Sequence, residues 1–355
     1  MRNAFPLNPE ITMPNNPPGT LLTGSQPEAA RAWDKLQSLP VDEDRSGETP
    51  APLRTKRTTI AKPMTVKGPG TFLGKEIRTI ELHPTEREGW WFDRTDIPES
   101  LRVEVGIHNV WTTGQIVSNI VLRSGPPNNY IRLVEHIIAL RMGMEIDDLV
   151  IKIDSGDPPL FDVGSMPLLE ALESAGSVES SYPVKYVTVK EPVHMTAPDG
   201  KLLVFEPADP ARPALDLDCA VDFPNAIGTQ RILTTINRET FRHGAHARTN
   251  TTAKKKLYCQ TLGKMFADVR NLGYTNKNVL IAGKHKYHNE AGLMHNGKSL
   301  EAVWHRAILD LLAAVALIDR GHFLGKISSF KAGHGMDVEA INLLYRNDLL
   351  TRMEI

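Results

Sequence analysis

The fold is decided by residues 133–154, which read LVEHIIALRMGMEIDDLVIKID. Leu133, Ile137 and Leu140 recur at the spacing of one helix face, so the first part of this stretch is predicted to be an amphipathic helix. The apolar run over residues 149–153 predicts a buried strand directly after it. A core-facing helix followed by a buried strand is the unit around which the rest of the chain is organised.

Two adjacent polar residues, Glu135 and His136, lie on this helix. His136 falls at the margin of the apolar face, and Glu135 projects about 100° around the helix from it. A carboxylate and an imidazole at such an edge can serve as general base and metal ligand. An isolated pair of this kind is more often a core-edge histidine beside a solvated glutamate, so the rest of the chain has to decide.

Length, charge and cysteine content limit the possible classes. The chain has 355 residues, enough for two ordinary domains and a tail. A formal net charge of -1 argues against a nucleic-acid partner, and two cysteines give no disulfide framework and no thiolate zinc cluster. The first residues lack the pattern of a signal peptide, and the longest uncharged apolar run, residues 311–318, is too short to span a bilayer. We therefore expect a cytoplasmic protein without a membrane span.

The order of predicted elements indicates three regions. Residues 1–56 are rich in proline and poor in large apolar residues, which predicts a tail or a docking arm. Residues 57–182 and 183–355 each predict strands together with two helices, including long helices over residues 252–271 and 300–320. The expected fold class is α+β, with two similar domains of mixed sheet and two helices each.

Six short motifs occur in a fixed order along the chain. They are residues 134–136 (VEH), 159–165 (PLFDVGS), 223–230 (FPNAIGTQ), 247–249 (ART), 308–310 (ILD) and 331–334 (KAGH). Over residues 57–355 the chain thereby resembles the UDP-3-O-acyl-N-acetylglucosamine deacetylases of lipid A biosynthesis. The resemblance implies two α+β domains whose sheets sandwich the helices, and hydrolysis of an N-acetyl amide on an acylated UDP-amino-sugar by a zinc-activated water.

The resemblance also implies roles for individual residues. Glu135 matches the general base, Thr249 matches the hydroxyl that stabilises the oxyanion, and His334 matches the histidine that supports the oxyanion and the leaving amine. His136 and Asp310 match two of the zinc ligands. This division of labour is chemically sound, because a carboxylate can take the proton of an acidified water while a cation and a hydroxyl meet the developing charge.

The chain departs from the family where the third zinc ligand is expected. That histidine should lie four residues before Asp310, and the position holds Arg306, followed by Ala307 where the family has lysine. His305 is adjacent, but five residues along an ideal α-helix place it about 140° away from Asp310. Arg306 is expected to pair with Asp310 and to weaken zinc binding, so Arg306→His is expected to restore the metal.

Two functions from different classes remain open. One is a deacetylase with an altered metal site, in which His305 or a histidine of the 285–295 loop is recruited, although that loop is more simply a polar surface loop. The other is a zinc-less, non-catalytic relative that binds a nucleotide-sugar, a lipid or a protein partner. For a UDP-sugar or another acylated small molecule, the substrate-binding positions implied by the resemblance are Phe161, Asn250 and Lys331.

Overall fold

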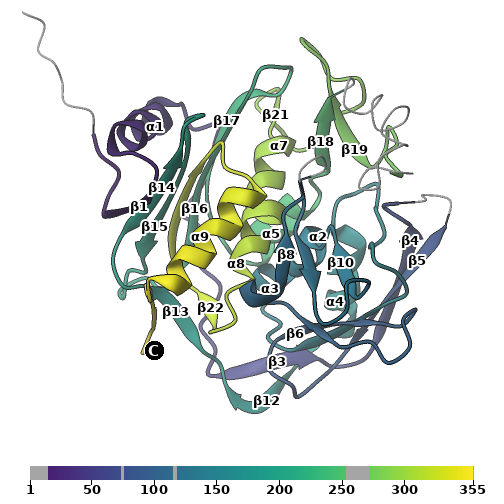
Figure 1. Cartoon of the computed structure of the whole chain (residues 1–355). Coiled ribbons are helices and arrows are strands. Elements are labelled where there is room, and N and C mark those ends of the chain that lie inside the picture. Colours follow the sequence, from purple (N-terminus) through teal and green to yellow (C-terminus); the bar gives the residue numbers. More distant parts are fainter. Residues whose placement is uncertain (1–14, 73–75, 115–117, 253–271, 355) are drawn as a thin grey trace, which may run out of the picture.

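The computed structural model describes residues 15–72, 76–114, 118–252 and 272–354. It contains two main β-sheets with helices between them (Figure 1), which confirms the predicted mixture of helices and sheets. The helix predicted over residues 252–271 lies almost wholly outside the described residues. The division at residues 56 and 182 stays a prediction.

The first sheet has five strands and is built around the strand predicted from residues 149–153. Its order is β4 (Met64–Pro69), β5 (Ile77–His83), β11 (Leu149–Ile153), β6 (Trp90–Arg94) and β7 (Val103–Glu104). β11 pairs antiparallel with β5 and parallel with β6, and its apolar side chains are buried. A strand inside the sheet and covered by helices needs the continuous apolar run seen in the sequence.

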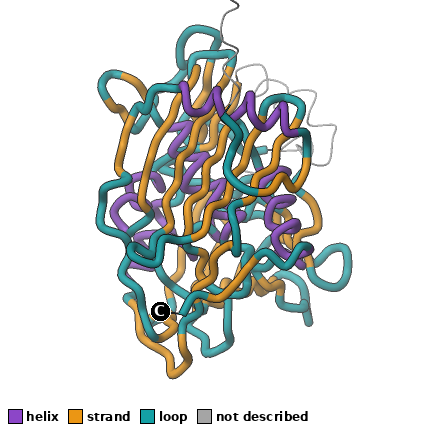
Figure 2. The backbone as a smooth tube through the Cα atoms, turned by 90° about the vertical axis from the view of Figure 1, so that its left-hand side faces the viewer, coloured by secondary structure: helices purple, strands orange, loops and turns teal. Residues whose placement is uncertain are grey.

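The second sheet has seven strands, and its two edge strands come from the N-terminal arm. Its order is β1 (Thr20–Thr23), β14 (Val193–Ala197), β15 (Lys201–Pro207), β23 (Gly325–Phe330), β16 (Leu215–Phe223), β17 (Gly228–Thr235) and β2 (Glu43–Arg45). Between β1 and β2 the arm forms α1 (Gln26–Ser38), which runs across the outer face of this sheet (Figure 2).

Helices fill the space between the two sheets (Figure 1). The first part of the chain supplies α2 (Glu135–Ile138), α3 (Leu140–Gly143) and α4 (Met166–Ala175), and the second part supplies α5 (Arg238–Ala245), α7 (Glu301–Trp304), α8 (Leu312–Val315) and α9 (His334–Arg346). One hydrophobic cluster joins these layers and includes Ile137, Ile151, Leu217 and Leu309, all at most 2% exposed. The helices that carry the predicted site residues therefore pack against each other inside the molecule.

The described fold also contains further short strands and a short 3₁₀ helix. They are η1 (Ile107–Asn109), β3 (Lys56–Ile60) with β12 (Ser177–Pro183), β8 (Val110–Thr112) with β9 (Val121–Arg123) and β10 (Tyr130–Arg132), β13 (Tyr186–Val189) with β22 (His322–Phe323) and β24 (Leu350–Arg352), β18 (Thr249–Thr252) with β19 (Val279–Ala282), and β20 (Met294–His295) with β21 (Lys298–Ser299). No helix among the described residues is long and apolar enough to cross a membrane.

The predicted helix over residues 300–320 is not a single α-helix. A π-helical segment, η3 (His305–Leu311), separates α7 from α8. A π-helix forms i→i+5 hydrogen bonds, so one of its turns holds one residue more than an α-helical turn. The apolar pattern of this region does not reveal that change, because buried residues surround η3 on both sides along the chain.

Candidate functional site

The first part of the site lies where α2 begins. Leu133 has a φ of 57°, a left-handed conformation that is rare and costly for a residue other than glycine. Its backbone N–H donates to Oδ1 of Asn119 at 3.3 Å. The turn leads directly into Glu135, which is 3% exposed and whose Oε1 accepts the backbone N–H of Ile120. The carboxylate of Glu135 is therefore fixed in a buried position.

The loop of residues 159–165 is hydrogen-bonded to the backbone of His136. The hydroxyl of Ser165 donates to the backbone carbonyl of His136 at 2.9 Å, and its N–H donates to the carbonyl of Ala245 at the end of α5. Gly164 has a φ of 60°, and a Cβ there would lie 2.3 Å from the carbonyl oxygen of Ala245. Only glycine lets the loop pass this close to α5.

Three polar atoms from separate segments of the chain lie within 3.2 Å of one another. Nε2 of His136 lies 3.1 Å from Nε2 of His305 and 3.2 Å from Oγ1 of Thr249, and Thr249 Oγ1 lies 3.1 Å from His305 Nε2. Burial, reinforced by the nearby His305, lowers the pKa of His136 to about 3. The imidazole of His136 is therefore neutral near pH 7 and has a lone pair to offer.

His305 reaches this position because of the π-helix. Its Nδ1 lies 3.3 Å from Oδ1 of Asp310, five residues later. The expectation that His305 points away from Asp310 is wrong, because it assumed α-helical geometry, whereas residues five apart lie on the same side of a π-turn. Burial opposes a charge on His305, but the carboxylate of Asp310 outweighs it and raises the pKa of His305.

The expected pairing of Arg306 with Asp310 is also wrong. Both terminal nitrogens of the Arg306 guanidinium donate to Asp337 of α9 at 2.6 Å, and one donates to the hydroxyl of Ser329 at 3.1 Å. Arg306 is 4% exposed and Asp337 is 1% exposed. The same π-turn that directs His305 into the site directs Arg306 toward α9. Sequence reasoning missed Asp337, although it follows the predicted site residue His334 by almost one helical turn.

His334 begins α9 and completes the cluster. Its Nε2 lies 3.4 Å from Oδ1 of Asp310 and 3.6 Å from Oε1 of Glu135. Burial raises the pKa of Glu135, although His334 opposes the rise. Burial would also raise the pKa of Asp310, but His305 and His334 hold it well below its usual range. Asp310 is therefore the more acidic of the two carboxyl groups.

These side chains border a cavity of about 60 Å³. Much of its wall is apolar, and the apolar residues that line it are Leu133, Ile137, Pro158, Pro159, Leu160, Phe161 and Leu168. Phe161 is thus placed at the site. Asn250 and Lys331 are not among the described residues that line the cavity, and the Lys331 ammonium instead donates to the backbone carbonyl of Asp199 at 3.2 Å. His285, His288 and His295 are likewise absent from the described lining.

The residues can be tested for their fit to zinc. Among the described residues, no three His, Cys, Asp or Glu side chains already surround a common metal position. Two imidazoles and one carboxylate, as in His136, His305 and Asp310, are nevertheless a donor set that zinc uses. Two nitrogens that share a tetrahedral zinc lie roughly 3.3 Å apart, and the two Nε2 atoms here lie 3.1 Å apart. The donors therefore fit zinc in kind, and the two imidazoles fit it in spacing.

Comparison with known proteins places this chain in a family. The sequence model of the UDP-3-O-acyl N-acetylglycosamine deacetylases (LpxC) matches residues 57–346. The UDP-3-O-acyl-N-acetylglucosamine deacetylase of Bdellovibrio bacteriovorus is 29% identical over 281 residues, which cover 78% of this chain and 85% of the relative.

Two further relatives carry the same name. The protein from Actinobacillus pleuropneumoniae serotype 3 is 25% identical over 298 residues, 82% of this chain and 91% of the relative. The protein from Nitratidesulfovibrio vulgaris is 25% identical over 297 residues, 82% of this chain and 88% of the relative. The chain therefore belongs to the UDP-3-O-acyl N-acetylglycosamine deacetylase family, a family of amide hydrolases.

Proposed function

We propose that the chain hydrolyses the N-acetyl amide of an acylated UDP-amino-sugar, as a divergent deacetylase of the lipid A pathway type. The observation that carries this proposal is the 3.1 Å approach of His136 and His305, with Glu135 and His334 beside them. These groups come from distant parts of the chain. Their convergence at one cavity is expected of a site that does chemistry.

Zinc is the metal that this donor set favours, with His136, His305 and Asp310 as the residues that would hold it. When bound, zinc supplies a Lewis acid that polarises a carbonyl group and makes water more acidic. Burial keeps the imidazole of His136 deprotonated, which is the form that binds a metal, whereas His305, whose pKa Asp310 raises, would release its proton on binding. Arg306 does not oppose zinc binding, since its guanidinium forms an ion pair with the carboxylate of Asp337.

Glu135 is assigned as the general base. Its carboxylate borders the cavity and is held by the backbone N–H of Ile120. Burial raises its pKa, which increases its affinity for the proton of an attacking water. Proton transfer to Glu135 would leave hydroxide to attack the amide carbon.

His334 and Thr249 are assigned to the charge that develops on the substrate. Nε2 of His334 lies 3.6 Å from Oε1 of Glu135 and 3.4 Å from Oδ1 of Asp310. A protonated His334 can donate its proton to the departing amine. The hydroxyl of Thr249 borders the same cavity and can donate a hydrogen bond to the oxyanion.

The alternative of a zinc-less binding protein is less well supported. It depended on the loss of the third ligand to Arg306. His305, with its Nε2 3.1 Å from that of His136 and its Nδ1 3.3 Å from Oδ1 of Asp310, is instead a candidate for that ligand, and Glu135 remains as a carboxylate base. A protein that only bound its ligand would have no need of that combination.

The test is hydrolysis of UDP-3-O-acyl-N-acetylglucosamine by the purified chain. Glu135→Gln is expected to lower kcat by about 10²–10⁴-fold while retaining substrate binding. Glu173→Gln, which changes an exposed carboxylate that is not among the described residues lining the cavity, serves as the matched control. Absence of both turnover and calorimetric binding with the unmodified chain would remove the substrate assignment.

A further inference from the structure

The N-terminal arm contains a segment that we call the belt, residues 20–45, which lies outside the 57–346 region matched by the family. We propose that the belt is a positioning element of the site, and that Glu43 acts through Trp304 to hold His305 in place. The proposal rests on the proposed function for the role of His305 as a metal ligand.

The belt is attached to both edges of the seven-stranded sheet. β1 pairs parallel with β14 at one edge, and β2 pairs parallel with β17 at the other, with Glu43 opposite Ile232. Between them α1 crosses the outer face of the sheet (Figure 2). Ala32 and Leu36 of α1 belong to a buried cluster with apolar side chains of that face, Leu202, Val204, Ala220 and Phe330. The belt is therefore an integral part of the sheet.

A buried arginine fixes the point where α1 turns toward β2. Arg231, 6% exposed, donates through Nη1 to the backbone carbonyls of Leu36 at 2.8 Å and Leu39 at 3.0 Å. Its Nε and Nη2 donate to both carboxylate oxygens of Asp218 at 2.9 and 2.7 Å. Asp42 accepts the backbone N–H of Arg231 and the ammonium of Lys298. These contacts restrict the backbone position of the next residue, Glu43.

Glu43 connects the belt to the helix that carries the site. Its Oε2 accepts the indole N–H of Trp304 at 2.9 Å. Trp304 has no exposed surface, and the ring of His243 packs against it with its edge at a centroid distance of 4.7 Å. A Cβ at Gly244 would lie 2.9 Å from Cε3 of the indole, so α5 leaves the ring little room to move.

Trp304 immediately precedes the π-turn. A shift of its indole would rotate α7 and move His305, whose Nε2 lies 3.1 Å from that of His136. π-helical turns are rare and depend on their surroundings. Packing and polar contacts must therefore determine which residues form the turn and in which direction their side chains point. Without Glu43, the buried indole N–H would lose its acceptor, and the ring would be drawn toward another one.

The experiment compares full-length variants by zinc affinity in chelator competition, by kinetics, and by hydrogen–deuterium exchange of peptides from residues 301–312. Glu43→Ala is expected to weaken zinc binding and to lower kcat by about 3–10-fold, less than the 10–100-fold typical of a group bonded directly to a ligand. KM is expected to stay unchanged, and exchange of residues 301–312 is expected to rise. Glu43→Gln, which keeps an acceptor oxygen, should restore all three quantities to within about twofold.

Asp44→Ala is the matched control, because the carboxylate of this exposed neighbour bonds Ser46 and no residue of the helix. It is expected to change none of these quantities. If Glu43→Ala lowers only the unfolding midpoint and leaves zinc affinity and exchange unchanged, the positioning role is refuted. If the unmodified chain neither binds zinc nor hydrolyses the substrate, the proposed function fails, and the exchange of residues 301–312 still decides whether Glu43 holds the helix.

Discussion

Nδ1 of His305 lies 3.3 Å from Oδ1 of Asp310 although the two residues are five positions apart. The family pattern has a histidine four positions before this aspartate. A π-turn holds one residue more than an α-turn, so we interpret the difference as a single inserted residue. On this interpretation the ligand has not been lost to arginine, and Arg306 follows His305 as a basic residue follows the histidine in the family.

The buried pair of Arg306 and Asp337 leads to the first prediction. Arg306→Met should lower the free energy of unfolding by about 3–5 kcal/mol, because it leaves the Asp337 carboxylate, 1% exposed, without its partner. The double variant with Asp337→Leu should recover most of that loss, since two apolar side chains need no pairing. Denaturant unfolding measures both changes.

The same pair reverses the expectation for Arg306→His. This substitution should destabilise the fold in the same way and should not increase zinc affinity, because the side chain points to Asp337 and Ser329. An Arg306→His variant with unchanged stability and stronger zinc binding would show that position 306 faces the metal after all.

Close packing of α5 against the π-helix gives the second prediction. A Cβ at Gly244 would lie 2.4 Å from Cγ1 of Ile308 and 2.9 Å from Cε3 of Trp304. Gly244→Ala should therefore destabilise the fold by about 1–3 kcal/mol and weaken zinc binding, despite the better helix propensity of alanine. Gly47→Ala is the control, because no described residue other than its chain neighbours lies within 4 Å of the added methyl group. Equal stability of the two variants would contradict the packing described.

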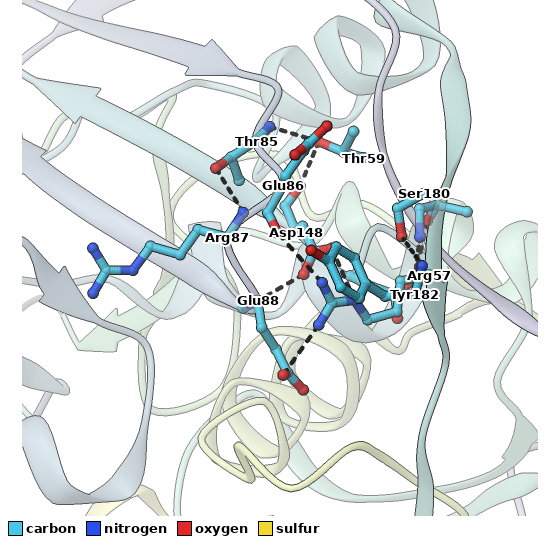
Figure 3. A network of polar contacts seen from close by, with 12 residues as sticks. Arg57, Thr59, Thr85, Glu86, Arg87, Glu88, Asp148, Ser180 and Tyr182 are labelled. Atoms are coloured by element: carbon cyan, nitrogen blue, oxygen red, sulfur yellow. Dashed lines mark hydrogen bonds and ion pairs between the residues drawn. The ribbon is translucent and has the colours of Figure 1, made fainter.

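A buried carboxylate that does not line the cavity predicts a pH effect on stability. Asp148 has no exposed surface and accepts the N–H of Gly89 at 2.9 Å, and Arg57 lies 3.1 Å from its Oδ2 (Figure 3). Burial raises the pKa of Asp148 to about 6 from 3.8, although Gly89 and Arg57 oppose the rise. Between these two values the folded chain retains a proton that the unfolded chain has released. This group therefore reduces stability as pH rises from about 4 to about 6.

Asp148→Asn should remove that dependence. We compare the free energy of unfolding of the variant with that of the unmodified chain at each pH. The difference in favour of the variant should be about 1–3 kcal/mol larger at about pH 7.5 than at about pH 4.5. Glu86→Gln is the control, since Glu86 enters the network in Figure 3 through its backbone carbonyl. A constant difference between Asp148→Asn and the unmodified chain across this range would show that Asp148 titrates normally.

The sequence predicted the elements whose pattern is set by burial. The apolar faces of residues 133–153 identified helical structure and a strand because every second or fourth side chain had to face the core. The single helix predicted there is instead the two short helices α2 and α3, with a turn at Ala139 between them. The arm was harder to place. Its strands are short, and it is held by partners far along the chain, such as Arg231 and Trp304, which local composition does not reveal.

The site could be predicted only in part for a geometric reason. Glu135, His136 and His334 belong to recognisable motifs, and their side chains lie close together in the structure. The π-turn has no apolar signature of its own, because residues on both sides of it are buried in either kind of helix. If the segment is taken as an α-helix, Arg306 is predicted to point toward Asp310 and His305 away from it, which is the reverse of the structure. For the same reason, Asp337 could not be predicted as the partner of Arg306.

The central claim is that His305, brought in by the π-turn, is the third metal ligand. Zinc content after dialysis of the purified chain tests it most directly, with His295→Ala as the control because His295 lies outside the described lining of the cavity. The unmodified chain and His295→Ala should each retain about one equivalent of zinc, and His305→Ala should retain much less, because two protein ligands are one fewer than catalytic zinc normally has. A full equivalent of zinc in His305→Ala would contradict the claim.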